Sequence, residues 1–328
     1  MSPSLFLESF PATRYHIRKD KDTEVAMIED TYYGLSAEGF HKVYYRTYGE
    51  AHMEDTLFCV HGLTRNSADF HFLAQALENK FRVVCPDVVG RGKSARFQQA
   101  RHYSYHQYLS DMNVLMQRLR VPHVDWLGTS MGGLFGIVLA SLPEAPIRRL
   151  ILNDIGPFVP ATAVDRLKTY AGIPMEFKDM HEADAFLRVA YAPFGPMSAE
   201  AWQYFLEHSL RATNAGTLTL DYDIRATAAV EGDNQDALAL GEDPEGNVTF
   251  WRFWDNIKCP VLLLHGKHSD LVPQRVIDEM RMRGPSFDLV QFEDAGHAPS
   301  LTQPDQIQAV KDWLEKTDPI VRTLSCQK

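Results

Sequence analysis

The sequence predicts an α/β fold with a mostly parallel, doubly wound sheet, and the pattern of its apolar segments supports that prediction. Short apolar runs are typical of strands that are buried on both faces, and the clearest is the continuous run at residues 259–265. They alternate with segments of helical, amphipathic period such as residues 103–119. This alternation indicates parallel strands with helices on both faces of the sheet. It breaks between about residues 158 and 248, which indicates an insertion.

Composition limits the classes of function. A chain of 328 residues with 45% hydrophobic content can bury a large core without disulfides or a metal. The net charge of -10 argues against nucleic acid as a partner. The four cysteines stand singly, as in a reduced chain: Cys59, Cys85, Cys259 and Cys326. The N-terminal sequence has no basic leader and no segment has the length of a membrane span, so we expect a cytoplasmic protein that does not bind a membrane.

The first half of the chain follows the strand-helix rhythm after a polar arm of about 22 residues. Aromatic and β-branched runs predict strands, and a 3.6-residue apolar period predicts helices. The predicted strands are 41–48, 56–60, 81–85, 124–127 and 150–154, and the predicted helices are 68–78, 103–119 and 134–142.

The inserted segment is rich in aromatic residues and is predicted to be helical, with no obvious strand. Its expected helices are 163–170, 182–191 and 199–211, with prolines between them. The rhythm then returns with a strand at 259–265, a helix at 273–281, a strand at 287–292 and a closing helix from 303 or 304 to 316. We therefore expect a core of residues 1–156 and 249–328, with a helical cap at 157–248.

A candidate nucleophile lies between the strand at 124–127 and the helix at 134–142. The sequence Gly128-Thr129-Ser130-Met131-Gly132 predicts a sharp turn whose glycines let the backbone segments approach closely. The turn would expose the Ser130 hydroxyl, and the unpaired Met131 amide would point at a developing oxyanion. A serine at a helix start is also an ordinary N-cap, so the interpretation depends on partners elsewhere in the chain.

Two other motifs are weaker candidates for sites. The loop Asp87-Val88-Val89-Gly90-Arg91-Gly92-Lys93-Ser94 nearly matches a phosphate-binding loop, but Asp87 replaces its first glycine and would repel phosphate. His265 and His268 lie near Asp270, but His265 falls inside an apolar run and no further ligands with zinc spacing follow. We therefore expect no metal and no cofactor.

Serine attack on an acyl carbon needs a histidine base and a carboxylate that orients it. In a parallel sheet these groups come from loops at the carboxyl ends of strands. Asp270 follows the strand at 259–265, and His297 follows the strand at 287–292. Asp154 also ends a strand and is the alternative acid, but Asp270 fits the Ser…Asp…His arrangement of loops more directly.

As a set, these motifs resemble the α/β-hydrolase family. The resemblance covers the chain from about residue 40 to its end and includes His61-Gly62, the loop at 87–94, the turn around Ser130, Asp270 and Gly296-His297. It implies Ser130 as nucleophile, His297 as general base and later acid, and Asp270 as the residue that orients His297. It also implies a cap inserted after the sixth family strand and an oxyanion hole formed by the backbone N–H groups of Leu63 and Met131.

Serine rather than aspartate at the turn favours an acyl-enzyme and disfavours the dehalogenase and epoxide hydrolase reactions of the family. We predict hydrolysis of a small-molecule carboxylic ester, lactone or thioester. The alternative reaction is carbon–carbon bond hydrolysis of a diketone-like acid, and the alternative class is a non-catalytic small-ligand receptor. Arg65 is a candidate to steer an acidic substrate, although a surface arginine is the commoner case. A homodimer is left open, and His61 is expected to brace its loop.

Overall fold

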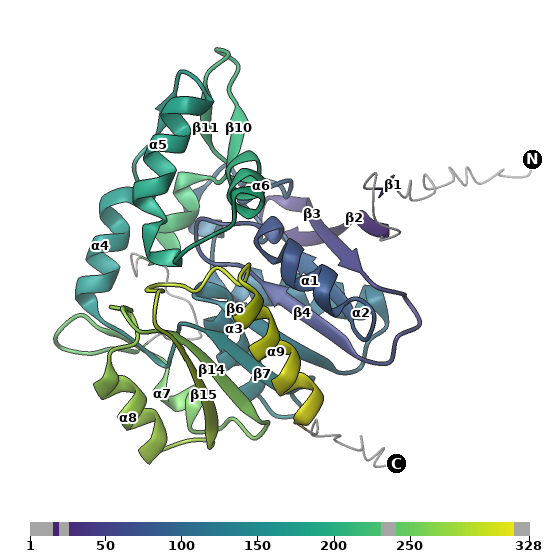
Figure 1. The fold of residues 1–328 in the computed structure, drawn as a ribbon, viewed down its shortest axis with the longest axis vertical. Helices are drawn as coiled ribbons and strands as arrows, with labels where there is room; N and C mark the ends of the chain where they lie inside the picture. The colour runs from purple at the N-terminus through teal and green to yellow at the C-terminus, as the bar shows by residue number, and fades with distance from the viewer. Residues whose placement is uncertain (1–15, 20–25, 231–240, 318–328) are drawn as a thin grey trace, which may run out of the picture.

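The computed structural model describes residues 16–19, 26–230 and 241–317, and within them a nine-stranded sheet forms the centre (Figure 1). In spatial order its strands are β1 (His16–Lys19), β2 (Ala26–Ser36), β3 (Gly39–Tyr48), β5 (Arg82–Pro86), β4 (Thr56–Val60), β6 (Val124–Thr129), β7 (Ile147–Asn153), β14 (Val261–Gly266) and β15 (Phe287–Phe292). From β5 to β15 all neighbouring strands are parallel, and β1, β2 and β3 extend the sheet antiparallel. This confirms the predicted fold class.

Helices cover both faces of the sheet, as Figure 1 shows. One buried cluster joins the sheet to α1 (His71–Leu77), which the short helix η1 (Ser67–Phe70) precedes, and to α9 (Pro304–Lys316). The cluster on the other face includes α2 (Tyr105–Leu119), which η2 (Ala100–His102) precedes, α3 (Met131–Ser141), α7 (Trp251–Trp254) and α8 (Gln274–Met282).

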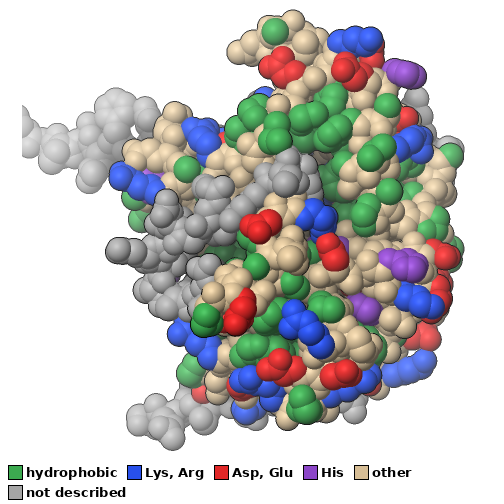
Figure 2. All heavy atoms as spheres, turned by 90° about the vertical axis from the view of Figure 1, so that its left-hand side faces the viewer, with side chains coloured by type: hydrophobic (Ala, Val, Ile, Leu, Met, Phe, Trp, Pro, Cys, Tyr) green, Lys and Arg blue, Asp and Glu red, His purple; other side chains and the backbone are tan. Residues whose placement is uncertain are grey.

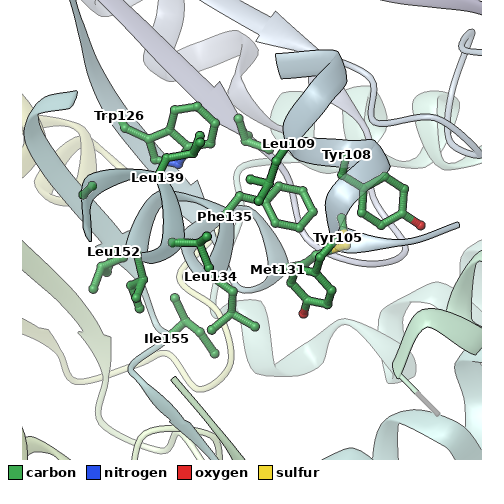
Figure 3. Close-up of a cluster of buried hydrophobic side chains, with 14 of the residues drawn as sticks. Tyr105, Tyr108, Leu109, Trp126, Met131, Leu134, Phe135, Leu139, Leu152 and Ile155 are labelled. Atoms are coloured by element: carbon green, nitrogen blue, oxygen red, sulfur yellow. The ribbon is translucent and has the colours of Figure 1, made fainter. Parts of the chain in front are cut away.

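The helix α3 lies in the middle of this second cluster. All of its residues except the last are buried, so the helix is apolar on every side. Figure 3 shows Phe135 and Leu134 of α3 between Trp126 of β6, Tyr108 of α2 and Leu152 of β7. This packing gives the residue that precedes α3 a rigid support.

The two ends of the inserted segment lie side by side as paired strands. Its first strand, β8 (Phe158–Val159), pairs with β13 (Val248–Thr249), next to which β12 (Gly241–Glu242) lies. Between them are α4 (Ala161–Ala171), β9 (Glu176–Phe177), α5 (Met180–Ala190), η3 (Ala192–Phe194), α6 (Ala199–Ser209), β10 (Leu210–Ala212), β11 (Leu218–Leu220) and η4 (Ile224–Val230). We call residues 157–248 the insert.

The insert has a small core of its own, in which Leu187, Tyr191, Phe205 and Leu206 are buried. Figure 1 shows α4, α5, α6 and the β10–β11 hairpin gathered on one side of the sheet. Figure 2 shows the side that carries α4, α5 and α8: hydrophobic side chains gather over the insert, and side chains of both charges are interspersed below it.

The structure differs from the sequence expectations at the N-terminal end and in the insert. Residues 16–19 of the expected arm form β1, and the rest of the arm lies outside the described residues, as does Cys326. The strand β2 and the short strands of the insert were not predicted. Cys59, Cys85 and Cys259 are buried, and no helix among the described residues is long and apolar enough to cross a membrane.

Candidate active site

Ser130 occupies a sharp turn between β6 and α3, as the sequence predicted. Its backbone has φ 51° and ψ -116°, which is unusual for a residue with a side chain. A Cβ atom on Gly128 would lie 2.2 Å from the carbonyl of Gly132, and a Cβ on Gly132 would lie 2.0 Å from the carbonyl oxygen of Val60. Only glycine fits at both positions, and the tight turn raises the Ser130 side chain above the sheet edge.

A chain of hydrogen bonds runs from Ser130 through His297 to a buried carboxylate. His297 lies in the loop after β15, and its Nε2 is 3.0 Å from the Ser130 hydroxyl oxygen. Its Nδ1 is 2.8 Å from Oδ2 of Asp154. The imidazole therefore lies between a hydroxyl that it can deprotonate and a carboxylate that fixes its tautomer.

Asp154 is the first residue after β7 and is fully buried. Besides His297, its carboxylate accepts a hydrogen bond from the Gly266 amide at 2.9 Å and one from the Ser269 hydroxyl at 2.6 Å. A buried carboxylate is costly unless its oxygens are hydrogen-bonded, and three donors meet that need: two from the end of β14 and the turn after it, and one from the loop after β15. The same bonds hold the carboxylate in one orientation toward the imidazole.

The expectation that Asp270 contacts His297 is wrong for this structure. The Asp270 side chain is 51% exposed, and its carboxylate accepts hydrogen bonds from Nε and Nη2 of Arg166 on α4 at 2.7 and 2.9 Å. A hydrogen bond from the Ser269 amide to the Gly266 carbonyl closes a tight turn directly after β14. This turn directs the side chain of Ser269, and not that of Asp270, toward Asp154. The alternative acid, Asp154, has the predicted geometry.

The loop after β4 runs beside Ser130. A Cβ on Gly62 would lie 3.6 Å from the Cβ of Ser130, so the Gly62–Leu63 peptide borders the hydroxyl. Within the described part of the chain, neither the Leu63 amide nor the Met131 amide donates to a protein acceptor. Both amides therefore have a hydrogen to offer to a ligand, as the predicted oxyanion hole requires.

His61 braces this loop. Burial lowers the pKa of its imidazole to about 3, so the ring is neutral at physiological pH. Nε2 accepts a hydrogen bond from the Val88 amide at 2.9 Å, which leaves the proton on Nδ1, and Nδ1 donates to the Gly62 carbonyl at 2.7 Å. The histidine thus links two loops at the sheet edge and keeps the Gly62 carbonyl in place.

Arg65, expected to bind an acidic substrate, is instead buried against other residues of the protein. It is only 4% exposed, its guanidinium pairs with Asp69, and Nη1 donates to Ser209 at the end of α6 at 2.7 Å. The guanidinium carbon lies 3.7 Å from the centre of the Phe205 ring. Arg65 therefore attaches the insert to the loop that carries Leu63.

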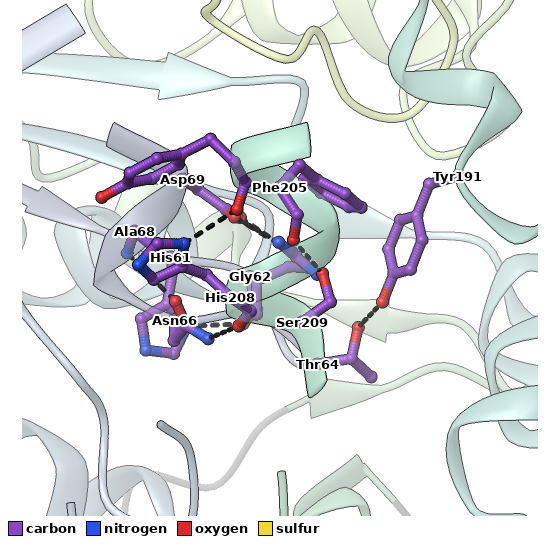
Figure 4. Close-up of polar contacts among 12 residues, drawn as sticks. His61, Gly62, Thr64, Asn66, Ala68, Asp69, Tyr191, Phe205, His208 and Ser209 are labelled. Carbon is purple, nitrogen blue, oxygen red and sulfur yellow. Dashed lines mark hydrogen bonds and ion pairs between the residues drawn. The ribbon is translucent and has the colours of Figure 1, made fainter. Parts of the chain in front are cut away.

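Two neighbouring bonds strengthen this attachment (Figure 4). The Thr64 hydroxyl lies 3.1 Å from the Tyr191 hydroxyl, and the Asn66 side chain donates to the His208 carbonyl at 2.7 Å. The loop next to Ser130 is therefore bonded to the insert at the C-terminal ends of both α5 and α6.

In the loop at 87–94, a side chain of the protein itself occupies a backbone amide that a phosphate would need. The buried Asp87 carboxylate accepts hydrogen bonds from the amides of Ser67 at 2.7 Å and Lys93 at 2.8 Å. His265 likewise has protein partners, because its Nε2 lies 2.9 Å from the Val272 carbonyl oxygen. Among the described residues, no group of three or more His, Cys, Asp or Glu side chains could hold a metal ion.

Sequence reasoning missed two supporting residues. Ser269 bonds to Asp154, and Asn153 donates to the Thr129 hydroxyl at 3.0 Å and to the Pro299 carbonyl at 2.9 Å. Asn153 thereby ties the ends of β6 and β7 to the loop of His297. Its position directly before Asp154, at the end of an apolar run, was the available signal.

The chain belongs to the α/β-hydrolase fold family, whose model matches residues 55–304. This confirms the resemblance noted in the sequence. The chain is 40% identical over 276 residues to the 3-hydroxybutyrate-oligomer hydrolase of Cupriavidus necator, and the match covers 83% of this chain and 92% of that relative.

Solved structures agree with the family assignment. A structure from Rickettsia typhi superimposes with a TM-score of 0.79 at 31% identity and covers 90% of this chain and 100% of that chain. An α/β hydrolase from Novosphingobium aromaticivorans gives a TM-score of 0.75 at 29% identity and covers 88% of this chain and 99% of that chain. The similarity therefore extends through the insert as well as the core.

Proposed function

We propose that this protein is a serine hydrolase that cleaves carboxylic esters through an acyl-serine intermediate. The observation that carries the proposal is the hydrogen-bonded chain from Ser130 through His297 to Asp154. From the 40% identity to a 3-hydroxybutyrate-oligomer hydrolase we further propose that the substrates are short ester-linked oligomers of 3-hydroxy acids.

In the acylation step, the Ser130 oxygen attacks the ester carbonyl carbon while His297 Nε2 takes the hydroxyl proton. The carbonyl oxygen becomes an oxyanion, and the amides of Leu63 and Met131 donate hydrogen bonds to it. Asp154 stabilises the imidazolium that forms. When the tetrahedral intermediate collapses, the imidazolium gives its proton to the departing alkoxide, which leaves as an alcohol.

In the deacylation step, His297 removes a proton from water, and the resulting hydroxide attacks the acyl carbon of acyl-Ser130. The same two amides stabilise the second oxyanion. Collapse of this intermediate returns the proton to the Ser130 oxygen and releases the acid. In a 3-hydroxy acid oligomer the leaving group is the hydroxyl end of one unit and the acyl part is the carboxyl end of its neighbour, so each cleavage yields two hydroxy acids or shorter oligomers.

We also propose that the insert is a cap over this site. The pairing of β8 with β13 supports the predicted boundaries, and the contacts of Arg65, Thr64 and Asn66 attach the insert to the loop of Leu63. A cap of this kind excludes water around the developing oxyanion, which strengthens its hydrogen bonds.

The direct experiment is to incubate the protein with the linear dimer and trimer of 3-hydroxybutyrate and to measure released 3-hydroxybutyrate by chromatography. We expect turnover by the wild type and a loss of about 10⁴-fold to 10⁶-fold in kcat for Ser130→Ala with unchanged folding. Ser141→Ala at the far end of α3 is the matched control, and it should retain wild-type turnover because its hydroxyl bonds the Val138 carbonyl within the same helix, at the opposite end from Ser130.

The outcomes separate the parts of the proposal. Turnover by Ser130→Ala at the wild-type rate would refute the serine mechanism. Hydrolysis of p-nitrophenyl butyrate without hydrolysis of the dimer or trimer would refute the substrate class and leave the ester hydrolase intact. Stoichiometric binding of the trimer without product would instead favour a receptor.

A further inference from the structure

Arg91 is a buried charge that the steps above do not use. Its side chain lies in the loop after β5 and is 0% exposed. Among the described residues, no carboxylate forms an ion pair with it. A buried guanidinium without a counter-ion is costly, so its donors must be well satisfied and its presence needs a reason.

All five N–H groups of Arg91 have a neutral acceptor. Nε donates to the Leu63 carbonyl at 2.8 Å, and Nη1 donates to the Val89 carbonyl and the Tyr108 hydroxyl, each at 2.9 Å. Nη2 lies 3.4 Å from the Ala226 carbonyl oxygen and 3.7 Å from the sulfur of Met131. All the hydrogen-bond donors of the guanidinium are therefore satisfied, but no negative charge neutralises it.

Two of these acceptors belong to the residues whose amides form the proposed oxyanion hole. In a trans peptide the carbonyl and the N–H point in opposite directions. The Gly62 carbonyl is held by His61 and by the Arg65 amide, which turns the Leu63 N–H to the other side. Arg91 holds the next carbonyl, that of Leu63, so the backbone of Leu63 is fixed on both sides.

The same side chain also contacts the insert. Arg91 Nη2 donates to the carbonyl of Ala226, which lies in η4 of the insert. In addition, the backbone of Arg91 forms an isolated antiparallel β-bridge with Tyr222 of the insert. Arg91 thus joins the loop of Leu63, the first residue of α3 and the insert at one point.

We infer that Arg91 is a positioning residue for the oxyanion hole, an inference that rests on the proposed ester hydrolysis. It holds the Leu63 amide in the direction that the tetrahedral intermediate requires. Its unpaired positive charge favours the anionic intermediate over the neutral ester, because electrostatic interactions are strong in a water-excluded site. Both effects act on the transition state and not on the bound substrate.

The test compares two variants. Arg91→Met removes both the positive charge and the hydrogen-bond donors, whereas Arg91→Lys keeps the charge but loses the planar arrangement of donors. With p-nitrophenyl butyrate we expect kcat to fall about 10²-fold in Arg91→Met and about tenfold in Arg91→Lys, with KM within about twofold of wild type. Inhibition by phenylboronic acid, which forms an anionic tetrahedral adduct with a serine, should weaken by the same factors as kcat/KM.

Arg149→Lys is the matched control. Arg149 is also a buried arginine, but it pairs with Asp125 and bonds the Leu314 and Thr317 carbonyls. This variant should lose thermal stability and keep wild-type kcat. Active sites in every variant are counted by labelling Ser130 with a fluorophosphonate, so that misfolded protein does not lower the apparent kcat.

Three results would overturn the inference: an unchanged kcat in folded Arg91→Met, a raised KM with unchanged kcat, or unchanged boronate inhibition with a lowered kcat. If Arg91→Met does not fold, Arg91→Lys decides by the same measurements. These failures differ from failure of the proposed function, which would appear as turnover by Ser130→Ala.

Discussion

The loops after β7 and β14 each bring an aspartate to the same edge of the sheet, but the two carboxylates have different surroundings. Asp154 is fully buried and accepts hydrogen bonds from His297, Ser269 and the Gly266 amide. Asp270 is 51% exposed and pairs with Arg166 of the insert. Residue type and topology are the same at the two positions, so the local backbone decides which one reaches the imidazole.

The backbone difference is visible at the strand ends. Asp154 follows β7 directly and has a φ of 53°, which turns its side chain back over the sheet edge. Asp270 comes four residues after Gly266, the last residue of β14, beyond a turn that the Ser269 amide closes. Distance from the strand end therefore separates a carboxylate held in the site from one that faces solvent.

The sharpest test of this comparison is Asp154→Asn. An amide would present an N–H to His297 Nδ1 and favour the wrong tautomer, so we expect kcat for p-nitrophenyl butyrate to fall about 10⁴-fold, as for the equivalent change in other serine hydrolases. The side chain volume is preserved, and a thermal melt followed by circular dichroism checks the fold. A loss of less than tenfold would mean that Asp154 does not orient His297 during turnover.

A smaller effect is expected from Ser269→Ala. The variant removes one of three donors to the Asp154 carboxylate, at 2.6 Å, and leaves the other two. Losing a hydrogen bond to a charged group corresponds to about 1.5 kcal/mol, or roughly a tenfold fall in kcat. Ser269→Thr keeps the hydroxyl and should recover most of the rate; if it is as slow as Ser269→Ala, the hydroxyl does not act through Asp154.

The smallest effect is expected from Asp270→Asn, the matched control for Asp154→Asn. A half-exposed ion pair contributes roughly 0–1 kcal/mol, so the melting temperature should fall by no more than about 4 °C and kcat should stay within about twofold of wild type. Kinetics with p-nitrophenyl butyrate measure both variants under the same conditions. A 10²-fold loss in Asp270→Asn would return Asp270 to the role that the sequence suggested.

Ser130 and His297 could be placed from the sequence because their signals are local. Glycine is required at 128 and 132 because a Cβ atom at either position would lie about 2 Å from a backbone atom, so the turn leaves a recognisable residue pattern in the sequence. His297 follows a strand of predictable length by five residues. The choice between Asp154 and Asp270 depended on side-chain direction, which the positive φ of Asp154 sets and the sequence does not reveal.

Other parts of the fold lacked a usable pattern. In β2, Tyr32 is buried while Tyr33 and Leu35 are exposed, so apolar residues occupy both faces and hide the alternation that predicts a strand. The strands of the insert have two or three residues, too few for any period. The burial of Arg65, a candidate substrate-binding residue, could not be predicted because one of its partners, Ser209, lies 144 positions away along the chain.

The pairing of β8 with β13 means that the polypeptide leaves the sheet and returns to it at neighbouring points. A segment whose two ends already meet can change in length or sequence without straining the structure that it interrupts. The residues between β8 and β13 can therefore vary while Ser130, Asp154 and His297, which follow other strands of the sheet, keep their geometry.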